Sequence, residues 1–276
     1  MSKTRSGILA LFLLAATFAG MPQAIAEEFH CEVLGLRGKV TATSSAGEER
    51  SLSEGDLVSP GETVMAEEMS SVDLAFDKEW KNIVHVDSGT SFEVVSVYPS
   101  KLKQKEGAMF AKLKSLPKDS SFEVKTPTAV ATVRGTEYRT TFQNGQTQVY
   151  NVSPSPVFVY GLQEDGSVNL DRQVILEQSK KTQIEKAGEV PQPPKDITEE
   201  EIAVTDAIKT AIDEKVQEVE ASGRVSKILS VKELENSIFE EEKKPEVISS
   251  SPLAEPNDTD ESRVTDLRRR PFKKVE

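Results

Sequence analysis

Residue types that carry catalysis and metal binding are scarce in this sequence. Its 276 residues include one cysteine, Cys31, and two histidines, His30 and His85. A zinc site needs three or four ligands held together, and a Cys/His nucleophile pair would have to use Cys31. The sequence also has no G-x-S-x-G nucleophile elbow and no glycine-rich phosphate loop. We therefore expect no catalytic residues, no metal site and no cofactor, and we do not expect an enzyme.

A single cysteine also excludes an internal disulfide. Cys31 either forms a disulfide between chains or shares a metal site with His30, or it is a residue without a role near a mobile new N-terminus. We favour the last interpretation, because a metal site built from these two residues would lack ligands. The sequence is consistent with a free thiol and with one that is paired between chains.

Positive charge is in deficit. The chain has 34 Lys and Arg residues against 46 Asp and Glu residues, which gives a formal net charge of −12. This balance argues against a nucleic-acid partner, which needs a positive surface. Hydrophobic residues make up 37% of the chain, which is low for a chain folded throughout. Part of it is therefore expected to be solvated or disordered.

Long apolar runs are absent apart from one near the N-terminus, Ile8 to Ala19. Lys3 and Arg5 precede this run, and the small residues of Ala24-Ile25-Ala26 follow it. The pattern is typical of a secretory signal peptide over residues 1–26, and the run is short for a bilayer span, which needs about 20 residues. An uncleaved anchor is the alternative. We expect a periplasmic or secreted protein with no transmembrane helix in the mature chain.

Residues 33–187 have the pattern of strands and turns. Apolar and polar residues alternate over Leu36–Thr43 and Ser71–Phe76, as they do in half-buried strands. Asn144-Gly145 lies between two β-rich runs and is a strong hairpin signal. Lys101–Leu116 fits either a short amphipathic helix or an edge strand guarded by lysines. We favour the strand, because every neighbouring element is β.

The pattern changes at Gly188. Residues 188–197 are rich in proline and predict a stiff linker, and residues 198–240 have a helical period that opens with a capping box, Thr198 and Glu201. An apolar stripe in this segment either packs on the β domain or pairs with a second helix, which would allow oligomers through the C-terminal helices. The stripe consists of Ile208, Ile212, Val216 and Val219. Residues 241–276 are charged and predicted to be disordered.

Three residues are candidates for binding. Arg134 either grips a carboxylate of a ligand or partner, or pairs with an internal acid, and we favour the internal pair. Thr136 belongs to the same Arg134-Gly135-Thr136 segment. Trp80, the sole tryptophan, lies in a charged stretch and is either an exposed anchor for a partner or folded back over the core.

The segment from Thr126 to Tyr138 resembles the FecR-like domain family, which is named for a periplasmic signalling regulator. It follows the family pattern T-P-x-A-x-x-x-V-R-G-T-x-[FY] at every defined position. Upstream, Gly55-Asp56 and Gly61-Glu62 are similar to the paired G-D turns of the family, with Glu62 in place of the second Asp. The resemblance covers roughly residues 34–160, and the chain departs from the family where residues 153–156 read Ser-Pro-Ser-Pro.

The resemblance implies an all-β fold and a role in contacting proteins, without catalytic residues. Regulators of this family carry an anti-sigma segment and a membrane helix before the domain, where this chain has only a signal peptide. We therefore expect a mainly β protein, with a FecR-like β-sheet domain followed by a short helical segment and a disordered tail. The expected function is that of an envelope protein that binds a protein partner or an envelope polymer in signalling. The alternative is a structural scaffold that assembles a complex through its C-terminal helices.

Overall fold

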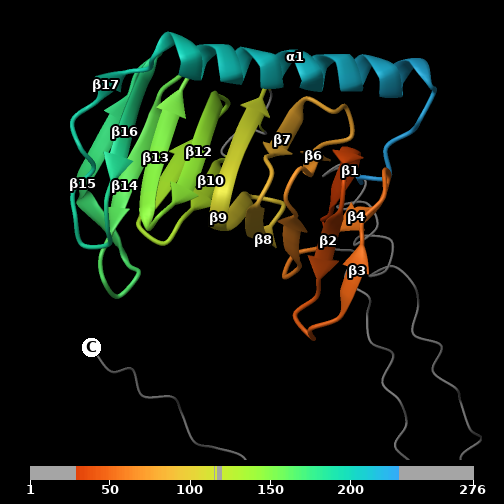
Figure 1. The fold of residues 1–276 in the computed structure, drawn as a ribbon, viewed down its shortest axis with the longest axis horizontal. Helices are drawn as coiled ribbons and strands as arrows, with labels where there is room; N and C mark the ends of the chain where they lie inside the picture. The colour runs from red at the N-terminus through yellow and green to blue at the C-terminus, as the bar shows by residue number, and fades with distance from the viewer. Residues whose placement is uncertain (1–28, 115, 117–119, 230–276) are drawn as a thin grey trace, which may run out of the picture. The chain divides into compact units, whose positions relative to one another are not determined.

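The computed structural model describes residues 29–114, 116 and 120–229. The signal peptide predicted at 1–26, the part of the helical segment beyond residue 229 and the tail predicted at 241–276 lie outside these residues. The described residues are mainly β, as the sequence predicts, with 17 strands and one helix (Figure 1). None of the helices in this part of the chain is long and apolar enough to cross a membrane.

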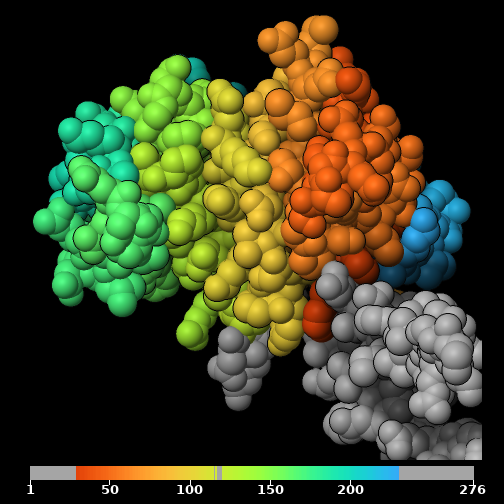
Figure 2. All heavy atoms as spheres, turned by 90° about the horizontal axis from the view of Figure 1, so that it is seen from below, coloured from red at the N-terminus to blue at the C-terminus, as the bar shows by residue number. Residues whose placement is uncertain are grey.

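The strands form two layers, and their order along each layer broadly follows the chain, as the colours in Figure 2 show. The strands of sheet A are, in order, β4 (Leu57–Val58), β1 (Cys31–Arg37), β6 (Ser71–Ala75), β7 (Asn82–Val86), the second half of β9 (Ser100–Leu113), β12 (Glu137–Gln143), β13 (Gln146–Asn151), β16 (Lys180–Ile184) and β17 (Lys195–Asp196).

Sheet B has a matching order. Its strands are β3 (Glu49–Ser51), β2 (Val40–Thr43), β5 (Thr63–Ala66), β8 (Thr90–Ser96), the first half of β9, β10 (Phe122–Lys125), β11 (Ala129–Val133), β14 (Val157–Leu162) and β15 (Val168–Leu176). The pairing of β9 with β10 is parallel, and the other pairs of described strands are antiparallel. The hairpin predicted at Asn144-Gly145 joins β12 to β13 and is confirmed.

Strand β9 belongs to both sheets and bends between them at Gly107. Up to Glu106 it pairs with β8 and β10 in sheet B, and from Gly107 it pairs with β7 and β12 in sheet A. Gly107 has φ +90, a conformation that favours glycine. At the bend, the buried Thr90 hydroxyl accepts from the Ala108 N–H at 3.0 Å and donates to its carbonyl at 3.1 Å. The lysine-rich segment predicted as a strand is therefore a strand, although a central and not an edge one.

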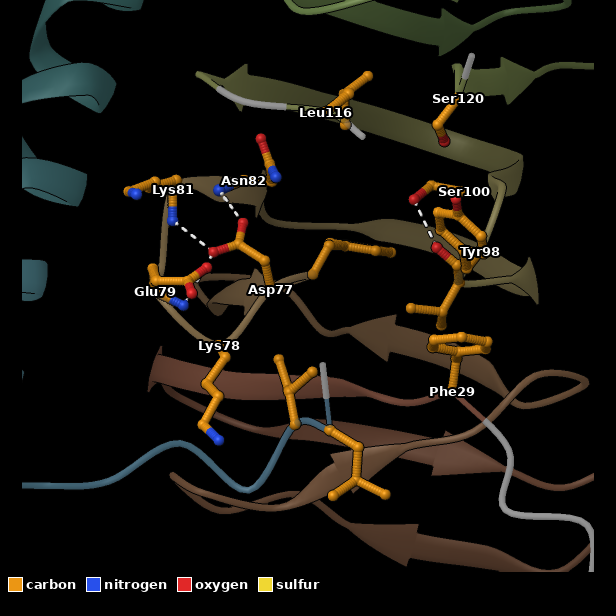
Figure 3. A pocket seen from close by; sticks show the side chains of 14 residues that line it. Phe29, Asp77, Lys78, Glu79, Lys81, Asn82, Tyr98, Ser100, Leu116 and Ser120 are labelled. Atoms are coloured by element: carbon orange, nitrogen blue, oxygen red, sulfur yellow. Dashed lines mark hydrogen bonds between the residues drawn. The ribbon is translucent and has the colours of Figure 1, made fainter. Parts of the chain in front are cut away.

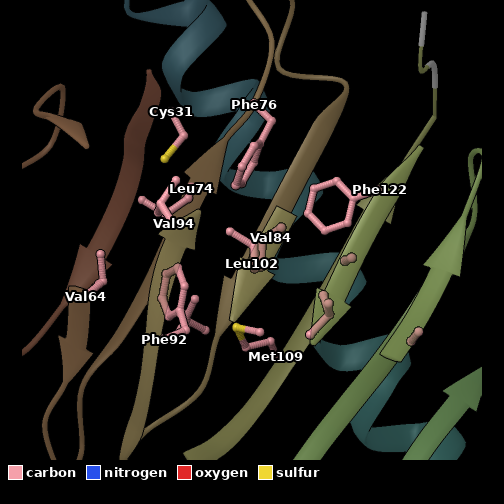
Figure 4. Packing of buried hydrophobic residues seen from close by; sticks show 14 of the residues in the cluster. Cys31, Val64, Leu74, Phe76, Val84, Phe92, Val94, Leu102, Met109 and Phe122 are labelled. Atoms are coloured by element: carbon pink, nitrogen blue, oxygen red, sulfur yellow. The ribbon is translucent and has the colours of Figure 1, made fainter. Parts of the chain in front are cut away.

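The main core lies between the two sheets (Figure 4). Phe92 and Leu102 from sheet B meet Leu74 and Val84 from sheet A there, and all four side chains are buried. Cys31 is also fully buried in this core, at the start of β1. The expectation of a residue near a mobile end was therefore wrong in its placement, because Cys31 begins strand β1 and its side chain is buried in the core. Burial raises the pKa of its thiol to about 12.

Helix α1 (Glu199–Ala221) covers part of the outer face of sheet A and adds a third layer (Figure 1). It begins with the predicted capping box of Thr198 and Glu201. Ile212 and Val219 are buried against Leu34 and Phe110 of the sheet. The apolar stripe thus packs within the chain, which was one of the two alternatives. A helix of 23 residues is roughly 34 Å long, enough to cross about seven strands at a spacing of about 4.8 Å.

Ion pairs fix α1 along its whole length. Near its start, Glu201 accepts from Lys181 of β16 at 2.6 Å, and in its middle Asp213 lies 2.5 Å from Lys112 of β9. Beyond its end, Arg224 donates to Glu32 of β1 at 3.1 Å. The Glu32 carboxylate is 1% exposed and also accepts from the Ser226 hydroxyl at 2.7 Å. The helix therefore joins strands from both ends of sheet A.

The segment predicted as a linker runs along the edge of sheet A. The Gln192 N–H donates to the Gln183 carbonyl at 2.9 Å, and the Thr182 hydroxyl donates to the Gln192 carbonyl at 2.6 Å. β17 then pairs with β16. These contacts position the start of α1 over the sheet.

We predict that Gly107→Ala strongly destabilises the protein. The new Cβ would lie 2.5 Å from Thr90 Cα, in addition to the strain of a positive φ. The matched control is Gly145→Ala, which carries the same kind of strain but meets nothing within 4 Å. In urea unfolding, Gly107→Ala should lose at least about 2 kcal/mol more than the control. Equal losses for the two variants would contradict this account of the bend.

We also predict that Asp213→Asn weakens the docking of α1. The Lys112 side chain is 4% exposed and would lose its partner carboxylate. Fully buried pairs cost about 3–5 kcal/mol to break, and because half of Asp213 is exposed we expect roughly 1–2 kcal/mol here. The control is Glu214→Gln, on the exposed side of the same helix. If both variants unfold at the same denaturant concentration, the pair does not stabilise the helix.

Candidate functional site

The segment Thr126–Tyr138, which follows the family pattern and is called here the family-like segment, forms a corner and a crossover between the sheets. Thr126-Pro127 turns the chain from β10 into β11, and the Thr126 side chain accepts from the Ala129 N–H at 2.9 Å. The hydroxyls of Thr126 and Thr128 each lie 2.6 Å from that of Thr147 in the interior. Residues 134–136 then carry the chain from β11 in sheet B to β12 in sheet A. The segment is therefore built to hold this crossover in one position.

A groove of about 580 Å³ opens at the crossover. Phe158 and Tyr160 of β14 lie on its wall, and both point to the outer face of sheet B because the intervening Val159 is buried in the core. Thr132 of β11 pairs with Phe158 in register. The complete lining is Thr132, Val133, Arg134, Gly135, Thr136, Ser155, Pro156, Phe158 and Tyr160.

The Ser-Pro-Ser-Pro segment, where the chain departs from the family pattern, forms one side of the groove. Asn151 is fully buried and donates to the Ser155 carbonyl at 2.8 Å and to the Leu176 carbonyl at 2.8 Å. The Ser153 hydroxyl accepts from the Glu137 N–H at 3.2 Å. These bonds hold Ser155 and Pro156 against the crossover.

Two of the three predicted binding residues meet in this groove. Arg134 is exposed and makes no hydrogen bond or ion pair with the residues that the structure describes. The internal acid that we expected as its partner is therefore not found in that part of the chain. Thr136 is 2% exposed, and its hydroxyl likewise has no partner among the described residues. The groove thus combines a guanidinium, two aromatic rings and an unpaired hydroxyl.

Trp80 lies elsewhere. Its side chain is 8% exposed and packs with Ile212 and Val219 between sheet A and α1, with the Arg224 guanidinium 5.9 Å from the ring centre. Of the two alternatives for this residue, the structure has the one in which it folds back over the core. An exposed anchor is not compatible with this placement.

The loop that carries Trp80 borders a second hollow, of about 270 Å³ (Figure 3). The Asp77 carboxylate in this loop accepts the N–H groups of Glu79 at 3.0 Å and Lys81 at 2.9 Å. Burial raises the pKa of Asp77 despite these hydrogen bonds. The Asp77 carboxylate therefore holds the shape of the loop. On the other side of the hollow, the ring centres of Phe29 and Tyr98 lie 5.3 Å apart.

A charged cluster lies on the outer face of sheet A and was not predicted from the sequence. His85 Nδ1 lies 2.7 Å from Asp73 and its Nε2 lies 3.3 Å from Asp87, which also accepts from Arg139 at 2.7 Å. Burial alone would lower the pKa of His85, but hydrogen bonds to both carboxylates outweigh it and raise the pKa to about 9. The spacing of His85 and Asp87 places them on one face of a strand, but nothing in the sequence indicates that β6 and β12 supply the rest.

Comparison with known families matches residues 59–153 to the family described as FecR protein. The matched residues contain the corner, the crossover and one side of the groove. The resemblance predicted from Thr126–Tyr138 is thus confirmed over residues 59–153, which match a FecR domain. The FecR family is regulatory, and its proteins are typically associated with the cell envelope. No curated protein matches the chain by sequence.

Two solved structures are similar in part. Both are crystal structures of a candidate anti-sigma factor from Parabacteroides distasonis, at 1.65 and 2.50 Å resolution. Each is 12% identical to this chain, with TM-scores of 0.40 and 0.41. The similarity covers 51% of this chain and 62% of theirs, so the chain spans less than two thirds of their length.

We predict that the protonated His85 stabilises the folded protein and that this stabilisation is lost at alkaline pH. Its pKa is about 9 in the folded protein against an ordinary value of 6.5. The stabilisation is therefore complete below pH 6.5 and is lost as the pH rises through about 9. By 1.36 kcal/mol per pKa unit it amounts to roughly 3 kcal/mol.

Urea unfolding of the parent protein and His85→Gln at pH 6 and pH 10 measures this difference. The parent protein should exceed the variant in stability by more at pH 6 than at pH 10. A difference that does not change between these pH values would show that His85 is not charged in the folded protein.

Proposed function

We propose that this protein is a non-enzymatic, exported envelope protein whose FecR domain binds a protein partner or an envelope polymer in signalling. One observation carries the proposal: the family-like segment ends in an open groove, where Arg134 has no partner among the described residues. Its donors are therefore open to a ligand, and the groove places this guanidinium together with the rings of Phe158 and Tyr160. Arginine and aromatic residues gathered at one site are typical of a surface that recognises another molecule.

The arrangement of layers supports the same proposal. Helix α1 covers part of sheet A, whereas no described element covers the outer face of sheet B. On that face, Phe158 and Tyr160 are half-buried and Ile175 of the edge strand β15 is 46% exposed. We propose that residues 33–187 form the recognition domain, that 188–197 act as a linker packed on its edge, and that export depends on a signal peptide at 1–26.

The alternative is a scaffold that assembles through the C-terminal helices of segment 198–240. The apolar side of α1, including Ile212 and Val219, is already buried on sheet A. Pairing of α1 with a second helix through these residues would first expose Trp80 and Phe110 to water. The placement of α1 therefore favours recognition by the β domain over assembly by this helix.

Crosslinking in cells from defined positions tests the proposal. A photoreactive amino acid replaces Tyr160 in the groove, and in a second variant it replaces Gln217 on the exposed side of α1. We expect a discrete adduct from position 160 and none from position 217. Point replacements are preferable to truncation after Gly188, which would expose the apolar face beneath α1.

Both variants should retain the thermal midpoint of the parent protein within a few degrees, because both positions reach the surface. An adduct from position 217 alone would support the scaffold. The absence of any adduct from position 160, in a folded and exported protein, would contradict the proposed function.

A further inference from the structure

We propose that the groove at the crossover receives an extended acidic segment of a partner protein. In this arrangement a carboxylate of the segment binds Arg134, and a neighbouring apolar side chain packs on Phe158 and Tyr160. The inference rests on the proposed function, because it names the chemistry of the ligand that the same groove takes.

The charge of this surface differs from that of the rest of the molecule. On the outer face of sheet B, Lys101, Lys103 and Lys105 occupy every second position of β9, and Lys125 lies on the adjacent strand. Arg134 extends this set to the crossover. Glu49, Glu93 and Glu123 lie on the same face and offset part of the charge, and Glu123 is paired in register with Thr132 of the groove. In a chain with a net charge of −12, a face with more bases than acids is complementary to an acidic ligand.

Helix α1 shows the contrast. It carries eight acids and two bases within 23 residues. The acids are Glu199, Glu200, Glu201, Asp206, Asp213, Glu214, Glu218 and Glu220. A partner with an acidic segment would therefore be repelled from the helix and attracted to the outer face of sheet B, so that it binds on that face.

The polar groups of the groove suit a carboxylate. The Arg134 guanidinium presents several donors in one plane, and a carboxylate is the group that this fork binds in a bidentate manner. The Thr136 hydroxyl lies buried at the base of the crossover and has no partner among the described residues. Both groups lack partners among the described residues, so no internal contact must break before a ligand binds.

The apolar wall suits a peptide. Phe158, Tyr160 and Pro156 lie beside one another and offer aromatic and ring surface to an apolar side chain. The volume of about 580 Å³ lies within the range of natural ligand pockets, about 300–1,000 Å³. One guanidinium at the end of such a wall matches one carboxylate next to an apolar residue. A uronic acid polymer presents a carboxylate on each sugar, whereas the lining of the groove holds one cation, Arg134.

The test is an NMR titration of the mature protein, labelled with ¹⁵N, with three probes. These are the peptide acetyl-Phe-Glu-Ala-amide, its counterpart acetyl-Phe-Gln-Ala-amide, and a tetragalacturonate. We expect saturable shifts of the Gly135 and Thr136 amide signals with the acidic peptide. Binding should be about fivefold weaker with the neutral peptide, because it forms no charge-assisted pair.

Two arginine variants complete the design. Arg134→Gln should reduce the affinity for the acidic peptide to that for the neutral one. Arg37→Gln is the matched control, since Arg37 is also exposed and without a partner among the described residues but lies outside the groove. It should bind like the parent protein. A well-dispersed amide spectrum shows that each variant is folded.

Three results would overturn the inference. They are equal affinity for the two peptides, equal loss in both arginine variants, and tighter binding of the tetragalacturonate, which would assign the groove to an acidic polysaccharide. Failure of the inference is distinguishable from failure of the proposed function. A partner crosslinked at position 160 with no preference for the acidic peptide contradicts only the ligand chemistry, whereas peptide binding without a crosslinked partner contradicts the proposed function.

Discussion

The bend of β9 at Gly107 is the constraint on which the rest of the structure depends. Because this strand is central in both sheets, its two halves set the register of β8 and β10 in one layer and of β7 and β12 in the other. The Thr90 hydroxyl bonds both backbone groups of Ala108 and keeps the bend closed. The crossover at Arg134-Gly135-Thr136 must therefore span a fixed distance, from the end of β11 to the start of β12. The groove inherits its rigidity from this geometry.

The pattern of burial along β9 shows how the layers differ. Its first half alternates lysines with buried residues, because sheet B is covered on its inner face only. Its second half is buried at every position from Gly107 to Leu113, because sheet A lies between the core and α1. Lys112 is tolerated in that run since Asp213 reaches it from the helix. The burial pattern of this one strand thus differs between the half in sheet B, whose outer face is uncovered, and the half in sheet A, whose outer face is covered by α1.

Local signals predicted much of the fold. Asn144 and Gly145 both adopt positive φ in the hairpin, and the capping box at Thr198 begins the helix where expected. The sequence could not place Trp80, since a helix more than a hundred residues later covers it. The sequence identified Arg134 and Thr136 as candidate binding residues, but it did not predict the groove that they line. Its aromatic wall depends on which strand pairs with β11, and alternation alone indicates the face of a residue but not its neighbours.

The contact between Glu32 and Arg224 joins residues 192 positions apart. A chain that is made, or passes through a membrane, from its N-terminus presents β1 long before the helix that covers it. Until residue 224 has followed, the apolar outer face of sheet A around Leu34 and Phe110 is open to water and to other chains. The third layer is thus closed by residues that follow every strand of both sheets in the chain, and the face that it covers stays exposed until they are present.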